Sequence, residues 1–535
     1  MSQPFGISCR GGLNTNLNEL EILSTPGSAR ILQNFEVDPD GGYRKVKGYT
    51  PFGGESAVKP GGDTTILGVE QYGEGVVVVV DDAVYYSDDG TAWIQVNKNT
   101  TSGGMNEATL AGATVLTRSG QGQAQFSLML APTGYTDNPF GSLTIATGTN
   151  KLANFRIEGT NPATRLFFYE ELTTPAAGTY VENHDLHLCV VDTENAPNTI
   201  YYSATQSDTD FVGAGSGAIS TTDRITGIKA FRDDLFVFTN NSIMKLVNIN
   251  DAASISLQPV THNVGCVSGY SIQEIGGDLI YLSPDGLRTI AGTVRIDDVE
   301  LSSASRQIQE IVSDVASRVN SYVISSGVLR GKSQYRLYYY TQGLESSASS
   351  GIIGTLVGDS FEWSTTKGIQ ASAFCSTLNY QGIEKLYHGD DKGYIYNHDT
   401  GNYFMEDGVQ ENIPAIYETP SFDFGDLGTR KTLKYVKVSF SPEGNVSPSL
   451  RLRYDYDSEE SPQPLDYTFS NIPAPSVFGT AIFGSDVFGG SSDPAVRQAV
   501  EGSGYTCSLR ISSDDISAPY AVNGIYIDYM PSGRR

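Results

Sequence analysis

The sequence predicts an all-β protein, in which an extended N-terminal arm is followed by a β-propeller of six to eight blades and then by an antiparallel β-sandwich. Three observations lead to this prediction. The 535 residues include 58 Gly, 31 Tyr and 22 Phe, a composition typical of strands joined by tight turns. Short strand–turn–strand units recur along the chain, and the pattern changes to strict alternation after about residue 412.

The clearest repeat unit lies in residues 265–298. Three short runs of strand-forming residues are separated there by turn sequences, which predicts a small antiparallel sheet with one face to bury. In chain order these are the run 271–275, the turn Gly276-Gly277-Asp278, the run 279–282, the turn Ser283-Pro284-Asp285-Gly286 and the run 287–290. Such a sheet needs neighbours.

Similar units occur at 75–86, 233–246 and 384–396. The two best-aligned copies start at Leu235 and Leu279, and their offset is close to the ~40–50 residues of one four-stranded propeller blade. Radial repetition of such sheets leaves only short protected edges and gives a β-propeller. A β-sandwich or several small β domains are the alternatives.

The chain is strongly acidic, with 35 basic and 61 acidic residues and a formal net charge of -26. This argues against non-specific binding to nucleic acid, which needs a basic surface. It also argues against close contact with an anionic membrane surface. The N-terminus, MSQPFGISCRGG, lacks the apolar core of a signal peptide, and the longest valine run, 76–80, is too short to span a bilayer. We therefore expect a soluble protein made in the cytoplasm, without membrane insertion.

Residues 1–55 predict an extended arm with one hairpin signal near residue 40. A basic cluster in this arm, Arg44, Lys45 and Lys47, is followed by Tyr49. These residues either form a solvated strand face or dock the arm on an acidic surface of the next subunit or of a neighbouring ring. We favour docking, because extended arms bury little surface by themselves.

Residues 56–405 are expected to form successive blades. The stretch 101–165 is rich in glycine, alanine and threonine and alternates only weakly. It therefore predicts either two divergent blades or an inserted β domain.

One helix is predicted over 302–320, with Ser303 or Ser305 as its N-cap. Five apolar side chains at helical spacing fall on one face: Ile308, Ile311, Val312, Val315 and Val319. An amphipathic helix packed on the outside of the propeller is favoured over a subunit contact.

Residues 412–535 predict the β-sandwich, because five runs alternate strictly, as half-buried antiparallel strands do. The runs are 422–424, 434–440, 450–456, 505–511 and 525–529. Between two of them, Phe483 and Phe488 lie among glycines. This apolar loop either folds over its own sandwich or is kept for a partner, so both phenylalanines are candidate contacts.

Three groups of residues invite a ligand site, and a structural interpretation is favoured for each. The stretch 87–93, SDDGTAW, resembles the Asp-box turn of sialidases shortened by one residue, and we expect a hairpin turn rather than a glycan site. His184 and His187 are three apart, which would place them on opposite faces of one strand, so a metal site is not expected. Acidic pairs could bind Ca²⁺, but solvated turns are favoured: Asp233-Asp234, Asp390-Asp391 and Asp455-Tyr456-Asp457.

Motifs for catalysis are missing from the sequence. No HExxH, GxSxG or P-loop pattern occurs, and five scattered cysteines predict neither a disulfide framework nor a CxxC metal site. We expect no catalytic residue, metal or cofactor.

Several stretches together resemble one family. GGLNT at 11–15, Asn34-Phe35 with an acidic-glycine turn, and RKVKGY at 44–49 are similar to the opening of the propeller proteins at the distal end of short-tailed bacteriophage tails, called nozzle, tail-hub or tail tubular B proteins. The stretches 225–243 and 265–288 and the terminus 523–535 carry the same likeness. These are loose patterns spread along most of the chain, and none is a catalytic signature.

The resemblance implies a non-enzymatic structural protein of the virion tail. It implies a homo-oligomeric ring, with six copies, that continues the DNA channel below the adaptor or connector proteins and serves DNA retention and ejection. Tail fibres or spikes are further partners in that setting. Six copies at -26 each would carry -156 formal charges, so DNA would slide past acidic walls without specific binding.

The competing class is a glycan-binding or glycan-degrading propeller, such as a lectin, a depolymerase or a sialidase-like enzyme. That class predicts a pocket with convergent carboxylates and aromatic rings.

Overall fold

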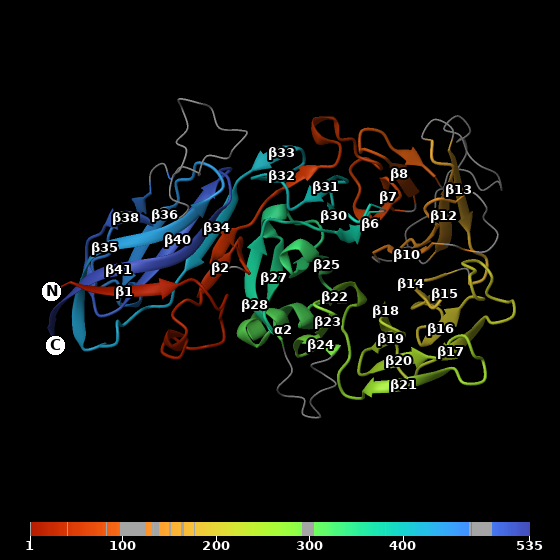
Figure 1. Cartoon of the computed structure of the whole chain (residues 1–535), viewed down its shortest axis with the longest axis horizontal. Coiled ribbons are helices and arrows are strands. Elements are labelled where there is room, and N and C mark those ends of the chain that lie inside the picture. The colour runs from red at the N-terminus through yellow and green to blue at the C-terminus, as the bar shows by residue number, and fades with distance from the viewer. Residues whose placement is uncertain are drawn as a thin grey trace.

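The computed structural model is an all-β chain with two parts, a propeller and a sandwich, which lie side by side along its longest axis (Figure 1). It describes residues 2–534 except positions 40, 82, 97–122, 131, 133–137, 149–150, 162–164, 176, 291–303, 380, 470–471 and 473–494. Both termini lie at the end of the sandwich that faces away from the propeller. The predicted fold class, a propeller followed by a sandwich, is confirmed.

The propeller consists of small antiparallel sheets arranged around one axis (Figure 1). Among the described residues, six of these sheets are separate. The first two contain β6 (Ile66–Tyr72), β7 (Gly75–Val80), β8 (Ala83–Ser87) and β9 (Ile94–Gln95), and then β10 (Gln125–Met129), β11 (Ser142–Ala146), β12 (Leu152–Glu158) and β13 (Leu166–Glu171). The next two contain β14 (Tyr180–His184), β15 (His187–Val191), β16 (Thr199–Tyr202) and β17 (Gly217–Ser220), and then β18 (Ile225–Phe231), β19 (Asp234–Thr239), β20 (Ile243–Val247) and β21 (Ser256–Thr261). The last two contain β22 (Gln273–Ile275), β23 (Asp278–Ser283) and β24 (Gly286–Thr289), and then β29 (Ala373–Leu378), β30 (Glu384–Gly389), β31 (Ile395–His398) and β5 (Tyr49–Pro51).

The ring is completed by four strands of a larger sheet, β25 (Val323–Leu329), β26 (Gln334–Tyr340), β27 (Ser350–Val357) and β28 (Ser360–Lys367). They fill a seventh position between the sheets of β22 and β29, because β25 packs against both of those strands. The arrangement falls within the six to eight blades predicted.

The apolar runs of the sequence become strands that are buried on both faces. All six residues of β7 and all five of β15 are buried, as are five of the six in β23. Each blade packs between two others, so its middle strands need apolar residues on both sides rather than alternation. The repeat unit predicted at 265–298 is confirmed as β22, β23 and β24 for its described residues.

The weakly alternating stretch 101–165 contributes to one blade. Its described residues from 125 onward form β10, β11 and β12, which pair with β13. Residues 97–122 lie outside the described part of the chain.

The predicted helix is shorter than expected: η6 (Arg306–Ile308) leads into α2 (Gln309–Ser317). Ile308, Val312 and Val315 are fully buried, and α2 packs against β24 of its own chain. Ser305 makes no cap; its hydroxyl accepts a bond from the backbone N–H of Leu287 at 2.9 Å. The other short helical segments of the described residues are η1 (Ile22–Ser24), η2 (Gly54–Ser56), η4 (Gly269–Ser271), η7 (Arg330–Lys332), η8 (Ser346–Ala348) and η9 (Asp455–Asp457).

The sandwich has two sheets. One contains β3 (Phe35–Val37), β4 (Tyr43–Lys45), β41 (Tyr520–Arg534), β35 (Thr429–Pro442) and β38 (Ala495–Ala499), with β1 (Gln3–Ser8) beside β41 and β39 (Ser503–Gly504) beside β35. The other contains β2 (Ile31–Gln33), β34 (Ile413–Glu418), β40 (Cys507–Asp515), β36 (Ser449–Tyr454) and β37 (Tyr467–Thr468). A separate hairpin, β32 (Phe404–Glu406) and β33 (Val409–Glu411), precedes them.

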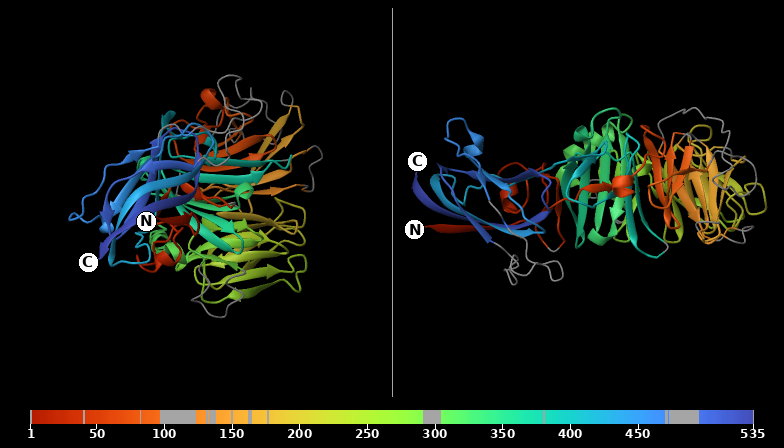
Figure 2. Two further views of the ribbon diagram at one scale, coloured as in Figure 1. Left: turned by 60° about the vertical axis from the view of Figure 1, so that its left-hand side comes forward. Right: turned by 90° about the horizontal axis from the view of Figure 1, so that it is seen from above.

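The propeller and the sandwich share one nine-stranded sheet. β2 joins the two parts, because it pairs in parallel with β28 on one side and antiparallel with β34 on the other. In Figures 1 and 2 the N-terminal segment accordingly runs between the two parts. The connection is therefore a continuous hydrogen-bonded sheet rather than a linker.

The N-terminal residues differ from the separate arm predicted over 1–55. β1, β3 and β4 belong to the sandwich, whereas β5 pairs with β31 and completes a propeller blade. An extended segment leaves its backbone N–H and C=O groups unpaired, and adding it to sheet edges satisfies them. No helix in the described part of the chain is long and apolar enough to cross a bilayer.

Candidate functional site

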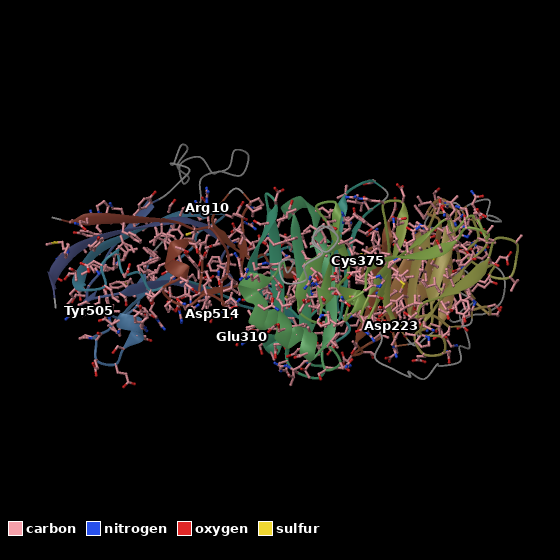
Figure 3. The ribbon with its side chains drawn as sticks, turned by 90° about the horizontal axis from the view of Figure 1, so that it is seen from below. Arg10, Asp223, Glu310, Cys375, Tyr505 and Asp514 are labelled. Carbon is pink, nitrogen blue, oxygen red and sulfur yellow. The ribbon has the colours of Figure 1, made fainter. Side chains whose placement is uncertain are left out.

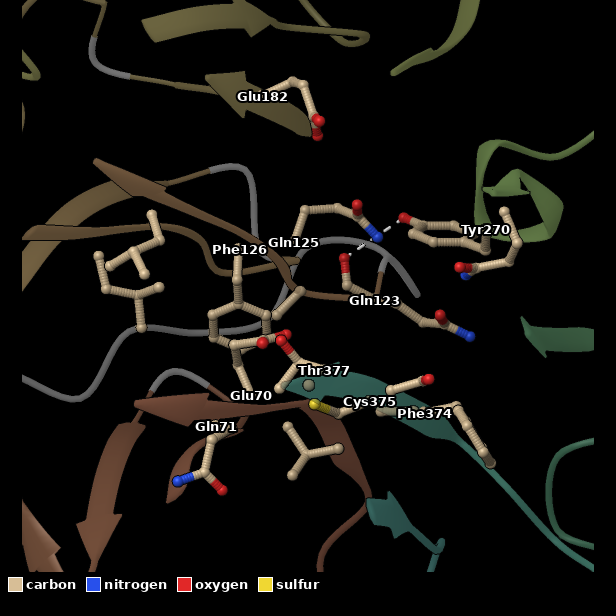
Figure 4. A pocket seen from close by; sticks show the side chains of 18 of the residues that line it. Glu70, Gln71, Gln123, Gln125, Phe126, Glu182, Tyr270, Phe374, Cys375 and Thr377 are labelled. Carbon is tan, nitrogen blue, oxygen red and sulfur yellow. Dashed lines mark hydrogen bonds between the residues drawn. The ribbon is translucent and has the colours of Figure 1, made fainter. Parts of the chain in front are cut away.

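One candidate site is a cavity of about 550 Å³ lined by the innermost strands of the propeller, called here the central cavity (Figure 4). Every innermost strand contributes to its wall: β6, β10, β14, β18, β22, β25 and β29. Figure 3 shows one lining residue, Cys375, inside the propeller, far from Tyr505 and Asp514 of the sandwich. A volume of this size lies within the ~300–1,000 Å³ of small-molecule sites.

Lys229 of β18 is surrounded by carboxylates in this cavity. Its Nζ donates to both carboxylate oxygens of Glu182 on β14, at 3.1 and 3.2 Å. The charge of Glu182 raises the pKa of Lys229 against the opposing effect of burial, and Glu70 and Glu274 act in the same direction as Glu182. The ammonium group therefore stays charged and neutralises part of an acidic wall.

Glu70 of β6 is the unusual acid of the cavity. Burial raises its pKa to about 7, although a hydrogen bond from the Cys375 thiol and the charge of Lys229 act the other way. Burial likewise raises the pKa of Cys375 well above its usual value. Because burial favours the neutral acid, the Glu70 carboxyl holds its proton to a higher pH than an exposed glutamate does, and the protonated form can donate as well as accept a hydrogen bond.

One end of the cavity is bordered by a chain of hydrogen bonds. The Tyr270 hydroxyl donates to the Gln123 carbonyl at 3.3 Å (Figure 4). Ser326 Oγ donates to the Tyr270 carbonyl at 2.6 Å, and Gln273 Nε2 donates to the Ser326 carbonyl at 3.1 Å. These bonds tie β22 and β25 to the residue that leads into β10.

The other end reaches solvent. Leu128, Leu130 and Leu378 line the cavity there and are 40%, 73% and 52% exposed. They lie at or just beyond the C-terminal ends of β10 and β29. A small molecule can therefore approach the carboxylates through an apolar entrance.

The predicted basic cluster is bound within the chain. Arg44 donates to Glu36 Oε1 at 2.8 Å and also to Glu443. Lys45 is fully buried, and its Nζ donates to Asp515 Oδ1 at 3.0 Å. These acidic partners belong to the same chain, whereas the sequence predicted docking on an acidic surface of another subunit or of a neighbouring ring.

Tyr49 and Lys47 have different surroundings. Tyr49 is 2% exposed, stacks on Phe404 at 5.4 Å and donates to the Met405 carbonyl at 3.0 Å. Lys47 is partly exposed. A contact with another subunit stays a prediction for Arg44 and Lys47, whereas Lys45 and Tyr49 are enclosed in this chain. Phe483 and Phe488 lie outside the described residues.

Sequence reasoning missed a buried group of charges where the two parts meet, called here the junction cluster: Glu36, Arg44, Lys332, Arg336 and Asp399. Glu36 accepts bonds of 2.8 Å from each of the three cations. Asp399 accepts from the last two at 2.8 and 3.2 Å. The residues are up to 363 positions apart in sequence, so no local pattern links them.

The charges of the cluster stabilise the ionised form of its central acid. Burial alone would raise the pKa of Glu36, but Lys332, Arg336 and Arg44 together lower it to about 2. The side chains of Glu36 and Arg336 are 3% and 1% exposed. A buried charge is tolerated only when it is paired in this way.

The cluster continues into two buried histidines. Arg336 and the Tyr338 hydroxyl contact His398 Nε2 at 3.0 and 2.9 Å. An arginine can only donate, so His398 Nε2 accepts, and His398 Nδ1–H donates to His388 Nδ1 at 3.1 Å. His388 then carries its proton on Nε2, which has no hydrogen-bond partner among the described residues.

His184 and His187, which the sequence analysis considered as metal ligands, are cross-strand partners. His184 ends β14, His187 begins β15, and the two pair directly across a two-residue turn. The expectation that they occupy opposite faces of one strand is wrong, because Asp185 and Leu186 adopt positive φ values of 50° and 65° and form a hairpin. His187 Nε2 is 2.9 Å from Asn250 Oδ1, and its Nδ1 contacts the Ser203 carbonyl.

The stretch 87–93 forms a turn, as favoured. Ser87 Oγ accepts from the Gly90 amide at 2.9 Å, and Asp89 Oδ1 accepts from the Thr91 amide at 2.9 Å. Gly90 has φ +79°, and a Cβ there would lie 2.3 Å from the Phe52 carbonyl, so only glycine fits. Trp93 Nε1 donates to the Val58 carbonyl at 2.7 Å.

The acidic pairs also serve local structure. Asp390 Oδ1 accepts from the Lys392 and Tyr394 amides, Asp234 pairs with Lys245, and Asp455 Oδ1 accepts from the Tyr505 amide. Within the described ranges, no group of three or more His, Cys, Asp or Glu side chains could hold a metal ion.

Comparison with known proteins gives distant likenesses only. No family model and no curated protein matches this sequence. Among solved structures, the extracellular domain of the putative hybrid two component system BT4673 from B. thetaiotaomicron is 10% identical with TM-score 0.33, covering 66% of this chain and 39% of that chain. The BBS1N chain, solved in complex with ARL6DN, is 10% identical with TM-score 0.34 (69% and 98%). The exo-beta-1,3-galactanase from Phanerochaete chrysosporium is 9% identical with TM-score 0.22 (90% and 100%).

Proposed function

We propose that this chain is a structural subunit of a bacteriophage tail. In this proposal several copies, six by the resemblance given above, assemble into a ring-shaped nozzle or hub below the adaptor and continue the channel through which DNA is retained and ejected. The subunit belongs to the virion, contacts adaptor or connector proteins and tail fibres or spikes, and lets genomic DNA pass without specific binding.

The observation that carries the proposal is the connection between the two parts. The nine-stranded sheet runs from the propeller into the sandwich, and the N-terminal segment pairs with both. Inter-domain motion is the default where parts are joined by a linker, and this chain replaces the linker with backbone hydrogen bonds. Such a subunit suits a ring that must keep its shape under load.

Two measurements test the proposal. Light scattering of the purified chain should give the mass of a ring, or of a ring once adaptor proteins are added, and cryo-EM of virions should place the propeller and the sandwich at the distal end of the tail. A chain that stays monomeric with adaptor present and is absent from virions would contradict the proposal.

The acidic charge offers a separate test of the channel. Replacing acidic residues that the virion map places on the channel wall by Lys should slow DNA ejection, because phosphates would then bind the wall. The same number of Lys substitutions on the outer surface is the control. Equal ejection rates for both sets would contradict DNA sliding past acidic walls.

A second candidate function is supported by the central cavity. A glycan-directed propeller predicts a pocket with convergent carboxylates and aromatic rings, and the cavity contains Glu70, Glu182 and Glu274 together with Phe126 and Tyr270. Hydrolysis of glycans by the purified chain, lost in Glu70→Gln, would favour an enzyme over the structural role.

A further inference from the structure

We propose that the central cavity is a binding site for a neutral saccharide unit, held by Gln125, Thr377 and Glu274 with Phe126 as an apolar wall. This site goes beyond the structural role, because it lies inside one propeller and needs no ring. No hydrolysis is part of the proposal.

The free polar groups of the cavity are its first support. The side chains of Gln125, Thr377 and Glu274 line the cavity and make no hydrogen bond within the described part of the chain. Figure 4 shows the Gln125 amide at the centre of the view, with Thr377 and Glu70 below it and Glu182 above it. An amide, a hydroxyl and carboxyl groups around one volume offer donors and acceptors together.

This mixture fits hydroxyl groups better than an ion. A sugar hydroxyl donates to a carboxylate and accepts from an amide or an ammonium group, so it uses every group present. An anion would be repelled by Glu182 and Glu274. A cation would meet Lys229, which already lies among the carboxylates. A neutral polyhydroxylated ligand avoids both conflicts.

The apolar lining and the size support a sugar ring in particular. Phe126, Phe374 and Tyr270 line the same volume, and aromatic side chains supply large apolar area next to polar groups. The cavity of about 550 Å³ exceeds the smallest common ligand sites of ~300 Å³. The exposed Leu128, Leu130 and Leu378 mark the entrance.

Titration calorimetry of the full chain tests the proposal. The probes are D-galactose, D-glucose, N-acetyl-D-glucosamine and their β-linked disaccharides. Each is used at up to about 20 mM, so that a Kd of about 1 mM, a binding free energy of about −4.1 kcal/mol, can still be measured. We expect at least one of them to bind with a stoichiometry of one per chain, in monomers and in rings alike.

Two variants locate the site. Gln125→Ala and Thr377→Val should each weaken binding by about tenfold, which corresponds to the loss of one ligand hydrogen bond of about 1.4 kcal/mol. The matched control is Gln258→Ala on the outer strand β21, which is exposed and should leave Kd unchanged. Circular dichroism and the melting temperature check that the variants fold.

Three results would overturn the proposal: no binding of any of these sugars, binding that neither Gln125→Ala nor Thr377→Val changes, or binding of n-butylammonium in place of the sugars. Because the measurement does not depend on assembly, failure here leaves the tail proposal intact, and a chain that never forms rings leaves this one intact.

Discussion

The junction cluster and the central cavity both gather charged side chains, but they satisfy them differently. In the junction cluster, Glu36 accepts from three cations, and the side chains of Glu36 and Arg336 are almost fully enclosed. In the central cavity, Lys229 is paired with Glu182, while Glu274 makes no hydrogen bond within the described residues. Charges that are fully paired and enclosed hold segments together, whereas polar groups that border an open volume are available to a ligand.

The largest effect is expected from breaking the junction cluster. Glu36→Gln would leave Arg336 and Lys332 short of a charge partner in a buried site, so the free energy of unfolding should fall by about 3–5 kcal/mol. Urea denaturation followed by tryptophan fluorescence measures this change. A loss below about 1 kcal/mol would mean that the cluster is solvated, and the contrast with the cavity would disappear.

Acid should weaken the junction next. Burial lowers the pKa of His388 to about 3. Burial also lowers the pKa of His398 well below its usual value, and His388, Arg336 and Lys332 lower it further. The unfolded chain therefore takes up protons first as the pH falls below about 6.5, and each histidine should reduce the unfolding free energy by about 1.4 kcal/mol per pH unit.

Two variants separate the contribution of the buried histidines to this pH dependence from that of the carboxyl groups. His388→Phe should lower the pH slope of the unfolding free energy between pH 6.5 and 5 relative to the parent chain. The exposed His262→Phe is the matched control and should follow the parent. Identical slopes for the parent and both variants would show that the buried pair does not couple to folding.

The cavity should respond to pH with the opposite sign. Because the pKa of Glu70 is raised to about 7, the unfolded chain ionises this residue from about pH 4.5 upward while the folded chain resists, so its cost to stability grows up to pH 7 and persists above it. Glu70→Gln should therefore be more stable than the parent by about 3 kcal/mol at pH 8 and equal to it at pH 4. Chemical denaturation at pH 4 and at pH 8 measures the difference in unfolding free energy between variant and parent. The same difference at both pH values would contradict a raised pKa of Glu70.

The smallest effect is expected at the surface. Arg451 and Asp466 form an ion pair at 2.6 Å, but their side chains are 38% and 40% exposed. Asp466→Asn should change the unfolding free energy by less than about 1 kcal/mol, because water screens such pairs. If Asp466→Asn lost as much unfolding free energy as Glu36→Gln, then pairing alone, and not enclosure from water, would explain why the junction cluster is stabilising.

Much of the propeller could be predicted from the sequence, because blades are local. The runs around Leu235 and Leu279 become β19 and β23, and the turn at 87–93 forms as expected. The histidine pair shows the limit of such reasoning: a two-residue turn at Asp185-Leu186 carries no glycine or asparagine, so the hairpin signal was missing.

The sequence by itself determined the all-β class, the strands of the blades and the alternating strands of the sandwich, because these depend on residues that are close in the chain. Only the tertiary structure decided where residues 1–55 pair, which acids meet Arg44 and Lys45, and which side chains surround the central cavity. Those contacts join positions hundreds of residues apart, such as Glu36 and Arg336. No local period records them, because they form only when separate sheets close around one axis.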